Sequence, residues 1–337
     1  MSSFLTLAIE SSCDETSAAI LDHKKVIALV TATQSVHEQY GGVVPELASR
    51  AHQSHIIPVL DKVLKDAQLQ LKDLQLLCVT EGPGLMGSLH VGVSLMKSLA
   101  MTQNLPLIGV NHMHGHVLAH CIEGQYDEEI SFPFLCLTVS GGHTQVVYVK
   151  SPTHLEILAQ TKDDAAGEAI DKAAKLFGLP YPGGPWVDKH AQQGDSNKFT
   201  FSTPKLDDGQ YSFSGLKTSL LYFLQAQSKL NEHFIAENLN HLCASYQKIT
   251  MDYLLKNFFN WAKKMEVKDV AIAGGVSANS YLRSTFIERG KQLKMKTFVP
   301  QFDYCTDNAA MIGITGYFQY HSGYQKRNIV PQPRMPF

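Results

Sequence analysis

The stretch FLTLAIESSCDET, residues 4–16, sets a pattern that recurs later in the chain. It begins with an apolar run typical of a β-strand, which ends at a glutamate, and a polar turn follows at residues 11–16. Two further runs of β-type residues come next, at residues 17–21 and 26–33. The pattern predicts three consecutive strands joined by short turns.

A series of helix, strand, helix and strand is expected after this first group. Residues 45–68 carry leucine and isoleucine at helical spacing, and residues 86–103 form a second helical stretch. Residues 76–80 form a buried apolar run that leads into the turn GPG at residues 82–84, and residues 107–110 form another strand. Strands alternating with helices in this way predict an α/β domain.

The same order of elements returns in the second half of the chain. The stretch FPFLCLTVSGGHTQVVYVK, residues 132–150, contains two strands around the turn SGGH, and a third strand is expected at residues 155–161. The later elements are predicted as helices at 165–177, 213–226 and 231–265, a strand at 270–273, a helix from Asn279, a short strand at Phe298 and a helix at about 307–321. Residues 179–206, rich in Pro, Gly and Asp, are predicted as loops beside a helical insertion. The repetition predicts two related α/β halves with a cleft between them.

Length and composition agree with two globular domains. The chain has 337 residues, of which 44% are hydrophobic and only 18% are charged. No apolar stretch approaches the roughly 20 residues of a membrane span, and residues 1–10 lack the basic start of a signal peptide. We therefore expect no membrane segment and a cytoplasmic location. The six cysteines include no CxxC pair and are expected to be free thiols.

Basic residues gather toward the end of the sequence. Residues 255–300 contain nine Lys and Arg against three Asp and Glu, a local net charge of +6 in a chain whose net charge is −2. Beyond Asp307 come Lys326, Arg327 and Arg334, and no acid. Such a cluster is typical either of a solvated helix face or of a polyphosphate partner such as RNA. The charge count alone favours the solvated face, and the acid-free tail favours RNA.

The segment NHMHGH, residues 111–116, carries the strongest chemical signal. His112 and His116 lie four residues apart, so on a helix they share a face and can bind one metal ion together, whereas His114 points elsewhere. Two imidazoles need a third ligand, for which a carboxylate is a common choice. The alternative is a pair of helix histidines with ordinary hydrogen bonds. A zinc protease would need a glutamate where Met113 stands, so that class is disfavoured.

Three glycine turns each follow a predicted strand, at residues 82–84, 140–142 and 274–276. Glycine lets backbone N–H groups approach phosphate oxygens, and the start of the next helix adds a favourable dipole. Three such turns in a duplicated chain favour a bound nucleotide. None matches GxxxxGK[ST] or GxGxxG, which argues against a P-loop and a dinucleotide fold.

Two acidic segments admit both a structural and a functional interpretation. In residues 163–172, helix capping accounts well for Asp163 and Asp164 but poorly for Asp171, which is available to accept hydrogen bonds from a hydroxyl group. Asp307, in the segment CTDN, is accounted for as a helix N-cap. As a metal ligand with His112 and His116 it would complete a His-His-Asp set that suits iron(II) or zinc, but nothing in the spacing alone connects residue 307 to residue 112.

Taken together, these segments and several others resemble one protein family, the bacterial-type tRNA adenosine threonylcarbamoyltransferases, formerly described as O-sialoglycoprotein endopeptidases. The resemblance runs from about residue 9 to residue 316. The matching segments are ESSCDET at 10–16, GGVVPELASR at 41–50, the histidine block, SGGHT at 140–144, residues 163–172, YPGGP at 181–185, FSGLKT at 213–218, residues 273–279 and CTDN at 305–308.

The resemblance implies a fold of two actin-like domains, as in Hsp70 and sugar kinases. It places domain I at residues 1–112 plus about 305–337, and domain II at about 113–304 with a helical insertion at about 165–260. The implied reaction transfers a threonylcarbamoyl group from threonylcarbamoyladenylate to the N6 amine of the adenosine 3′ of the anticodon, in tRNAs that read codons beginning with adenine. AMP is the other product.

The resemblance also implies functional residues. The ligands of one divalent ion per subunit, iron(II) or else zinc, are His112, His116 and Asp307. Residues implied to bind the adenylate are Thr138, Val139, Ser140, Gly141, Gly142, Asp171, Gly184, Asp188 and Asn279. His114 stands where many relatives carry glutamate, at a position that is not a ligand.

Partners and alternatives complete the expectations. The family implies a catalytically inert paralogous subunit and a small P-loop ATPase as protein partners, besides tRNA and the adenylate. No catalytic residue is assigned, and Glu10, Asp14 and a water on the metal stay open as the general base. A metabolite kinase of the same fold, an inert binding module and a metallopeptidase are the alternative functions. The histidine pair argues against the first, because magnesium prefers oxygen ligands.

Overall fold

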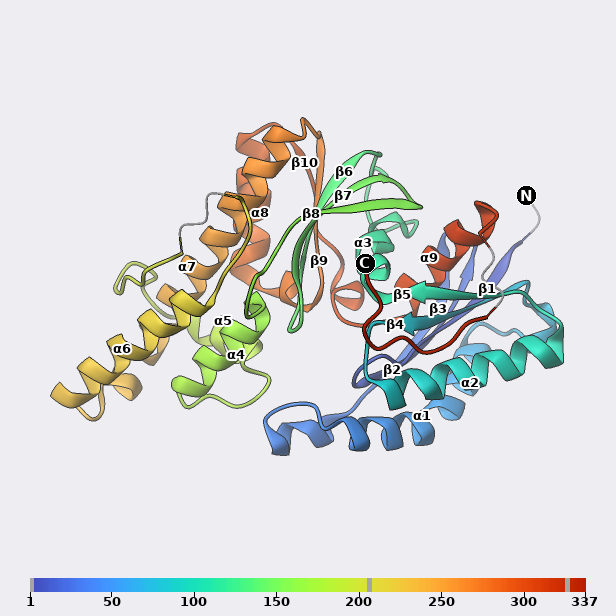
Figure 1. Cartoon of the computed structure of the whole chain (residues 1–337), viewed down its shortest axis with the longest axis horizontal. Helices are drawn as coiled ribbons and strands as arrows, with labels where there is room; N and C mark the ends of the chain where they lie inside the picture. The colour runs from blue at the N-terminus through green and yellow to red at the C-terminus, as the bar shows by residue number, and fades with distance from the viewer. Residues whose placement is uncertain (1–2, 205–207, 325–327) are drawn as a thin grey trace. The chain divides into compact units, whose positions relative to one another are not determined.

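Two five-stranded sheets organise the chain, one in each of two units (Figure 1). The computed structural model describes residues 3–204, 208–324 and 328–337. The first unit comprises Met1–Ser131, Lys150–Leu155 and Pro300–Phe337, and the second comprises Phe132–Val149 and Glu156–Val299. Each unit is described by itself below.

Some residues used in the sequence predictions lie outside the described part of the chain. Besides residues 1 and 2, they include Lys205 and Leu206 of the predicted loop region, and Lys326 and Arg327 of the basic tail. The domain limits implied by the family resemblance remain a prediction. In the structure, residues 113–131 belong to the first unit.

The first sheet has the strand order β3-β2-β1-β4-β5. Its strands are β1 (Leu5–Glu10), β2 (Glu15–Asp22), β3 (Lys25–Thr33), β4 (Leu76–Gly82) and β5 (Leu107–Asn111). Strand β1 runs antiparallel to β2 and parallel to β4, which in turn runs parallel to β5. Every residue of β1 and β4 is buried, as expected for central strands that helices cover on both faces.

Helices pack on both faces of this sheet. Helices α1 (Pro45–Asp66) and α2 (Met86–Gln103) cover one face, and α9 (Ala309–His321) with the short α3 (His112–Leu118) covers the other (Figure 1). Helix α9 approaches the strands so closely that a Cβ atom at Gly313 would lie 2.4 Å from Leu21 Cδ1. A larger residue there would displace the Leu21 side chain, so glycine allows α9 to pack closely against the sheet.

The second sheet repeats the strand order of the first, as β8-β7-β6-β9-β10. The strands are β6 (Phe134–Val139), β7 (Thr144–Ser151), β8 (His154–Gln160), β9 (Asp269–Ala273) and β10 (Lys296–Phe298). Strand β6 runs antiparallel to β7 and parallel to β9, as β1 does to β2 and β4. The predicted duplicated α/β fold is confirmed.

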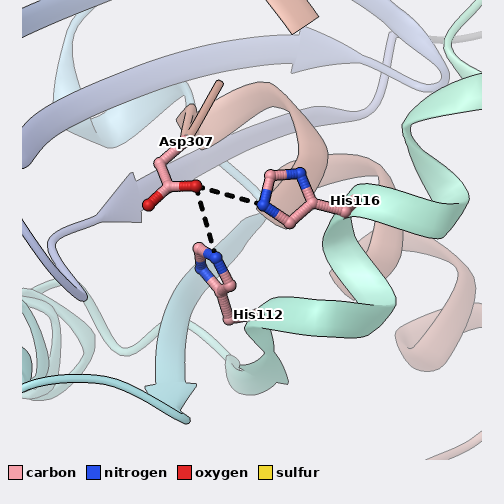
Figure 2. Close-up of side chains that lie close together, drawn as sticks. All are labelled: His112, His116 and Asp307. Carbon is pink, nitrogen blue, oxygen red and sulfur yellow. Dashed lines mark hydrogen bonds and ion pairs between the residues drawn. The ribbon is translucent and has the colours of Figure 1, made fainter. Parts of the chain in front are cut away.

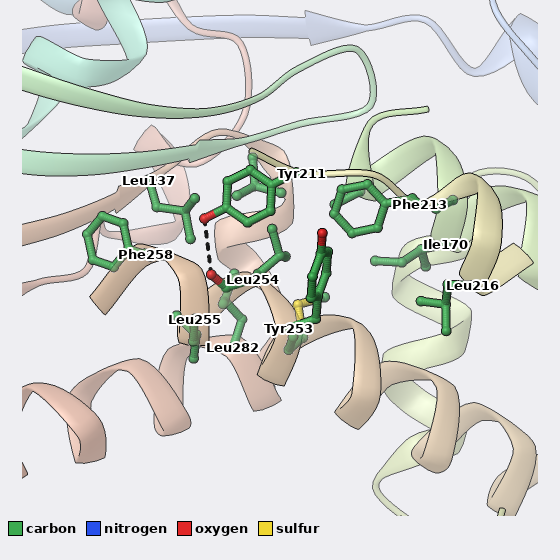
Figure 3. Close-up of a cluster of buried hydrophobic side chains, with 14 of the residues drawn as sticks. Leu137, Ile170, Tyr211, Phe213, Leu216, Tyr253, Leu254, Leu255, Phe258 and Leu282 are labelled. Atoms are coloured by element: carbon green, nitrogen blue, oxygen red, sulfur yellow. Dashed lines mark hydrogen bonds between the residues drawn. The ribbon is translucent and has the colours of Figure 1, made fainter. Parts of the chain in front are cut away.

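Five helices belong to the described part of the second unit. They are α4 (Ala166–Leu176), α5 (Gly183–Ala191), α6 (Ser214–Leu230), α7 (Phe234–Lys264) and α8 (Ser280–Gln292). Their core joins the sheet to α4, α6, α7 and α8, and within it the hydroxyl of Tyr211 donates to the Leu254 carbonyl at 3.1 Å (Figure 3). The predicted loop region missed α5.

The acids at the start of α4 do not cap that helix, so this prediction is wrong. The N-cap position of α4 is Ala165, which makes no side-chain bond. Asp163 instead accepts hydrogen bonds from the backbone N–H of Phe213 and the hydroxyl of Ser214, at 2.7 Å each, and thereby holds the residues at which α6 begins. Asp164 forms ion pairs with Lys172 and Lys217.

Two predictions drawn from composition can be compared with the structure directly. All six cysteines are free, and Cys78, Cys136, Cys243 and Cys305 are buried. Among the helices of the described residues, none combines the length and the apolar character needed to cross a membrane.

Candidate functional site

Helix α3 begins directly after β5 and carries the two histidines. Asn111 is its N-cap: the side-chain oxygen accepts hydrogen bonds from the N–H groups of Met113, at 2.9 Å, and His114, at 3.4 Å. One helical turn separates His112 from His116, so both rings lie on the same face. Both side chains are buried.

Asp307 completes the group from the other end of the chain. The N-cap of α9 is Asn308, whose side chain accepts from the N–H of Met311 at 3.0 Å, so Asp307 is not the cap. Its Oδ1 lies 3.1 Å from His116 Nε2 and 3.4 Å from His112 Nε2 (Figure 2). One ligand atom from each of the three residues lies within 4.8 Å of the others.

The charges of the three side chains depend on one another. Burial opposes ionisation of Asp307, but the neighbouring His112 and His116 outweigh it and hold the pKa of this carboxyl well below its usual range. Burial likewise opposes a charge on His112, yet Asp307 and Glu10 raise the pKa of the imidazole well above its ordinary value. The group therefore favours a cation between its acceptors, whether a proton or a metal ion.

Glu10 lies behind His112, on the side away from Asp307. Its Oε2 is 3.1 Å from His112 Nδ1, and the hydroxyl of Ser12 lies at the same distance from that nitrogen. The Glu10 side chain is fully buried and also accepts from the Thr80 hydroxyl. A carboxylate on the second nitrogen of a histidine fixes the tautomer that presents the first nitrogen to a metal.

This role of Glu10 was missed from the sequence, where it appeared only as a possible general base. A signal was available, because Glu10 closes an otherwise apolar strand that is buried throughout. A carboxylate buried at such a position needs a hydrogen-bonding or charged partner.

The three residues fit a divalent transition ion. Two imidazole nitrogens and one carboxylate oxygen suit iron(II) or zinc better than magnesium. In addition, Nδ1 of His116 is buried and has no hydrogen-bond partner among the described residues, so the only polar contact of this ring there is the one between Nε2 and Asp307. His114 lies outside the group. Its ring is 4.6 Å from that of Phe337, and burial lowers its pKa to about 4.

In the second unit, five of the predicted adenylate-binding residues lie at the end of β6 and in the turn that follows it. Thr138 and Val139 end β6, and Ser140, Gly141 and Gly142 form the turn. A Cβ atom at either glycine would meet no atom within 4 Å. Their backbone N–H groups donate to no residue in the described part of the chain, so this turn offers two unused donors in a region with open space beside it.

The start of α5 lies beside α4 because of Asp171. Its Oδ1 accepts hydrogen bonds from the N–H groups of Gly183, at 2.8 Å, and Gly184, at 3.2 Å. Burial raises the pKa of this carboxyl above its usual value, although the two bonds oppose the shift. Asp171 therefore caps α5 from a distance of twelve residues, and Gly184 also faces open space.

Asp188 joins α5 to the start of α8. Its Oδ1 accepts from Gln247 at 2.9 Å, from Asn279 at 3.3 Å and from the Ser280 hydroxyl at 2.6 Å. The Asn279 side-chain oxygen caps α8 by accepting from the N–H of Leu282 at 2.9 Å. Asn279 is thus held by contacts at both ends of its amide group.

These contacts bring the nine predicted residues to one edge of the second unit. The β6–β7 turn touches α4, since the N–H of Gly167 donates to the Ser140 carbonyl at 3.2 Å. The end of β9 touches the end of β6, where a Cβ at Gly274 would lie 2.5 Å from the Val139 carbonyl oxygen. The carboxyl ends of strands are the usual place for ligands in α/β sheets.

The first of the three glycine turns is not available for phosphate, which corrects that part of the sequence prediction. A Cβ atom at Gly82 would lie only 1.9 Å from the Gln332 carbonyl oxygen. The N–H of Gly84 donates to the Pro333 carbonyl at 3.2 Å. Residues near the end of the chain therefore fill the space that a ligand would need.

The basic cluster lies at the opposite edge of the second sheet from the open glycine turns. Lys268 directly precedes β9, and Lys263 and Lys264 end α7. Lys291 and Lys294 lie at the end of α8, before β10. All five are exposed. An RNA contact at this edge remains a prediction from charge.

The duplicated sheets define the class of the protein as an actin-like α/β fold, and the His-His-Asp group adds a candidate metal centre. A solved structure of HypF from T. kodakarensis shares this fold, with a TM-score of 0.62 and 14% identity over 98% of this chain and 50% of that chain. At this identity the likeness concerns the fold alone.

The sequence comparisons are more specific. Residues 25–314 match the family described as tRNA N6-adenosine threonylcarbamoyltransferase. The protein of this name from Christiangramia forsetii is 52% identical over 93% of this chain and 92% of its own length. Its counterpart in Riemerella anatipestifer is 51% identical over 96% of this chain and 95% of its own length. The chain belongs to the tRNA N6-adenosine threonylcarbamoyltransferase family.

Proposed function

We propose that this chain transfers the threonylcarbamoyl group of threonylcarbamoyladenylate to a tRNA. The acceptor is the N6 amine of the adenosine 3′ of the anticodon, in tRNAs that read codons beginning with adenine, and AMP is released. Membership of the family supports the reaction class and the tRNA substrate. The observation that carries the proposal is the convergence of the His112–His116 pair with Asp307, which lies 191 residues beyond His116 in the sequence.

His112, His116 and Asp307 are the proposed ligands of one divalent ion, iron(II) or else zinc. When bound, the ion supplies Lewis-acid polarisation of a phosphate or carbonyl oxygen of the substrate. Glu10 and Ser12 keep the Nδ1 proton on His112, so that Nε2 is the nitrogen available as a ligand. This contact favours a positioning role for Glu10 over that of the general base.

The adenylate is proposed to bind at the carboxyl edge of the second sheet. The free N–H groups of Gly141 and Gly142 suit phosphate oxygens, since the open space there leaves room for them. Asp171 uses one carboxylate oxygen to cap α5 and has the other for a ribose or threonyl hydroxyl. Asp188 is bound by three neighbours and positions Asn279.

The transfer itself is an acyl exchange. The adenine amine forms a bond to the carbamoyl carbon, and the bond from that carbon to the phosphate oxygen breaks. AMP leaves with the electron pair, and the amine loses one proton. An aromatic amine is a weak nucleophile, so an activated donor such as a mixed anhydride is needed. The anticodon loop suits the reaction because its bases are accessible outside a duplex.

Three further expectations belong to this proposal. A catalytically inert paralogous subunit and a small P-loop ATPase are the proposed protein partners. The proposed location is the cytoplasm, because that is where translation uses tRNA. No specific observation in the structure favours a metabolite kinase or a peptidase as a second function.

The experiment that tests the proposal follows labelled threonine into unmodified tRNA, with purified adenylate synthase and partner proteins. Asp307→Ala removes the carboxylate ligand, and we expect transfer at least about a hundredfold slower. Asp303→Ala is the matched control, because Asp303 is an exposed acid of the same segment, and it is expected to keep full activity. Unchanged transfer by Asp307→Ala, or ATP-dependent phosphorylation of a metabolite without tRNA, would overturn the proposal.

A further inference from the structure

Residues 328–337, called the tail segment here, contain no helix or strand and lie along the first unit. The trace in Figure 1 follows the segment past the ends of β4 and β5 to the side of α3. Three of its residues, Pro331, Pro333 and Pro336, are prolines. Each proline ring fixes φ and reduces the number of conformations open to the chain. The segment is therefore stiff for a stretch without regular structure.

The beginning of the tail segment is part of the core. The side chain of Ile329 is only 4% exposed and packs into the cluster beneath α1 and α2. The ammonium group of Lys97, on α2, donates to the Ile329 carbonyl at 3.1 Å. These contacts hold the beginning of the tail segment without involving α3, the helix that carries His112 and His116.

The middle of the tail segment is bound to the end of β4. The carboxylate of the fully buried Glu81 accepts from the N–H of Val330 at 3.3 Å and from the Gln332 side chain at 2.9 Å. The backbone N–H of Gln332 also donates to Glu81, to its carbonyl oxygen, at 2.7 Å. Because Gly82 has no side chain, the Gln332 carbonyl can lie directly against it.

The last residues reach the helix that carries the metal ligands. The amide nitrogen of Asn111 donates to the Pro336 carbonyl at 2.8 Å. The oxygen of the same amide caps α3. The ring of Phe337 lies 4.6 Å from the ring of His114, on the first turn of α3. Two contacts thus join the tail segment to the residues on either side of His112.

We propose that the tail segment positions the metal centre, by holding Asn111 and the first turn of α3. Asn111 has one amide group and uses both ends of it, so the orientation that caps α3 is also the one that binds Pro336. Metal sites require their ligands within about half an ångström of the productive geometry. Loss of the tail contact frees the Asn111 side chain and loosens the start of the helix that presents His112 and His116.

The test is a truncation after Pro333, which removes the contacts to Asn111 and His114 but keeps Ile329 and Gln332. We expect the dissociation constants of Zn²⁺, and of Fe²⁺ without oxygen, to rise about tenfold, since residues that orient metal ligands typically affect affinity by about 10–100-fold. Arg334→Ala, at an exposed position of the segment, is the control and should bind both ions like the full chain. Affinity is measured by competition with a chromogenic chelator.

A second variant isolates the contact itself. Asn111→Asp keeps the acceptor that caps α3 and loses the donor to Pro336. In the full chain it should weaken metal binding, and in the truncated chain it should have much less effect, because the partner is already absent. Additive effects in the two backgrounds would overturn the proposal. If the truncated chain does not fold, Phe337→Ala in the full chain removes the contact to His114 alone. It should also weaken metal binding, and unchanged affinity in both Phe337→Ala and Asn111→Asp would overturn the proposal.

Measuring metal affinity together with thermal stability distinguishes a positioning role of the tail segment from a purely structural one. A truncated protein that melts at a lower temperature without metal, yet binds Zn²⁺ as tightly as the full chain, would contradict the proposal. The inference rests on the metal site proposed above, so His116→Ala in the full chain is measured alongside. If His116→Ala binds metal normally, the proposed metal ligands are wrong, and this failure is distinct from a failure of the tail-segment proposal.

Discussion

The glycine turns after β4 and β9 occupy equivalent places in two sheets of the same strand order. Each contains a glycine against which a backbone carbonyl packs, Gly82 in the first and Gly274 in the second, but only the turn after β9 also has a glycine beside open space. At Gly82 a carbonyl oxygen of the tail segment lies where a side chain would begin. At Gly275, after β9, a Cβ atom would meet nothing within 4 Å. A glycine turn in an α/β fold therefore indicates a close backbone approach, and only its surroundings decide whether chain or ligand makes that approach.

The turns after β1 and β6 differ in the same way. In the first unit, the turn after β1 carries Ser12, which hydrogen-bonds His112 beside the buried Glu10. In the second unit, the equivalent turn has Gly141 and Gly142, with free N–H groups. One edge is therefore filled and supports the candidate metal centre, whereas the other has open space.

The largest effect is expected at the open edge. Gly142→Val places a side chain where we propose the phosphate, and transfer should fall by about a hundredfold because a displaced substrate reacts poorly. Thermal unfolding should change little, since the space is empty. Activity is measured with labelled threonine and stability by the melting temperature. A large loss of stability with normal transfer would remove the distinction between the two edges.

The next largest effect is expected at the filled edge. In Gly82→Ala the new methyl group collides with the Gln332 carbonyl, so the free energy of unfolding should fall by about 1–3 kcal/mol. The matched control is Gly275→Ala, which should stay within about 0.5 kcal/mol of the wild type. Urea denaturation of both variants measures the difference. Equal stabilities would show that the tail segment is not held at β4 as described.

A smaller effect is expected from the bond that holds α5 at the open edge. Asp171→Ala removes the acceptor for the N–H groups of Gly183 and Gly184, and stability should fall by about 1 kcal/mol, as for other helix caps. Asp171→Asn keeps an oxygen acceptor and should recover most of the stability. If Asp171→Asn regains stability but not adenylate binding, the carboxylate charge is needed to bind the ligand. Full recovery of adenylate binding by this variant would contradict that role.

The smallest effect is expected in the pH dependence of stability, through His52, which contacts the turn after β1. His52 donates to the Cys13 carbonyl at 2.9 Å and pairs with Thr16, and burial lowers its pKa below the ordinary value of 6.5. The unfolded chain then binds more protons, so this contribution to stability is complete above about pH 6.5 and is lost as the pH falls. His52→Gln should flatten the pH dependence of unfolding between pH 7 and 5. An unchanged slope would argue against a neutral His52.

The local patterns of the sequence predicted most of the fold. The alternation of apolar runs, turns and helical stretches gave the strands of both sheets and the duplication, because those signals are contained within each element. Helix α5 was missed because it begins with Gly183, Gly184 and Pro185 and takes its cap from Asp171 on another helix. A cap supplied from elsewhere in the fold leaves no local signal.

The site was predicted less evenly. The spacing of His112 and His116 indicated a shared ligand face, but nothing in the spacing linked them to Asp307; only the family resemblance did. The contacts of Glu10 with His112, and of Pro336 with Asn111, join residues more than a hundred positions apart. Such contacts are set by the tertiary fold, and a single sequence does not show them.

The central claim is that His112, His116 and Asp307 hold one divalent ion, and metal analysis tests it most directly. The full chain and Asp307→Ala are purified without oxygen, and their iron and zinc contents are measured together with their melting temperatures. We predict about one ion per wild-type chain and almost none in the folded variant. A folded Asp307→Ala that retains the full metal content would contradict the account.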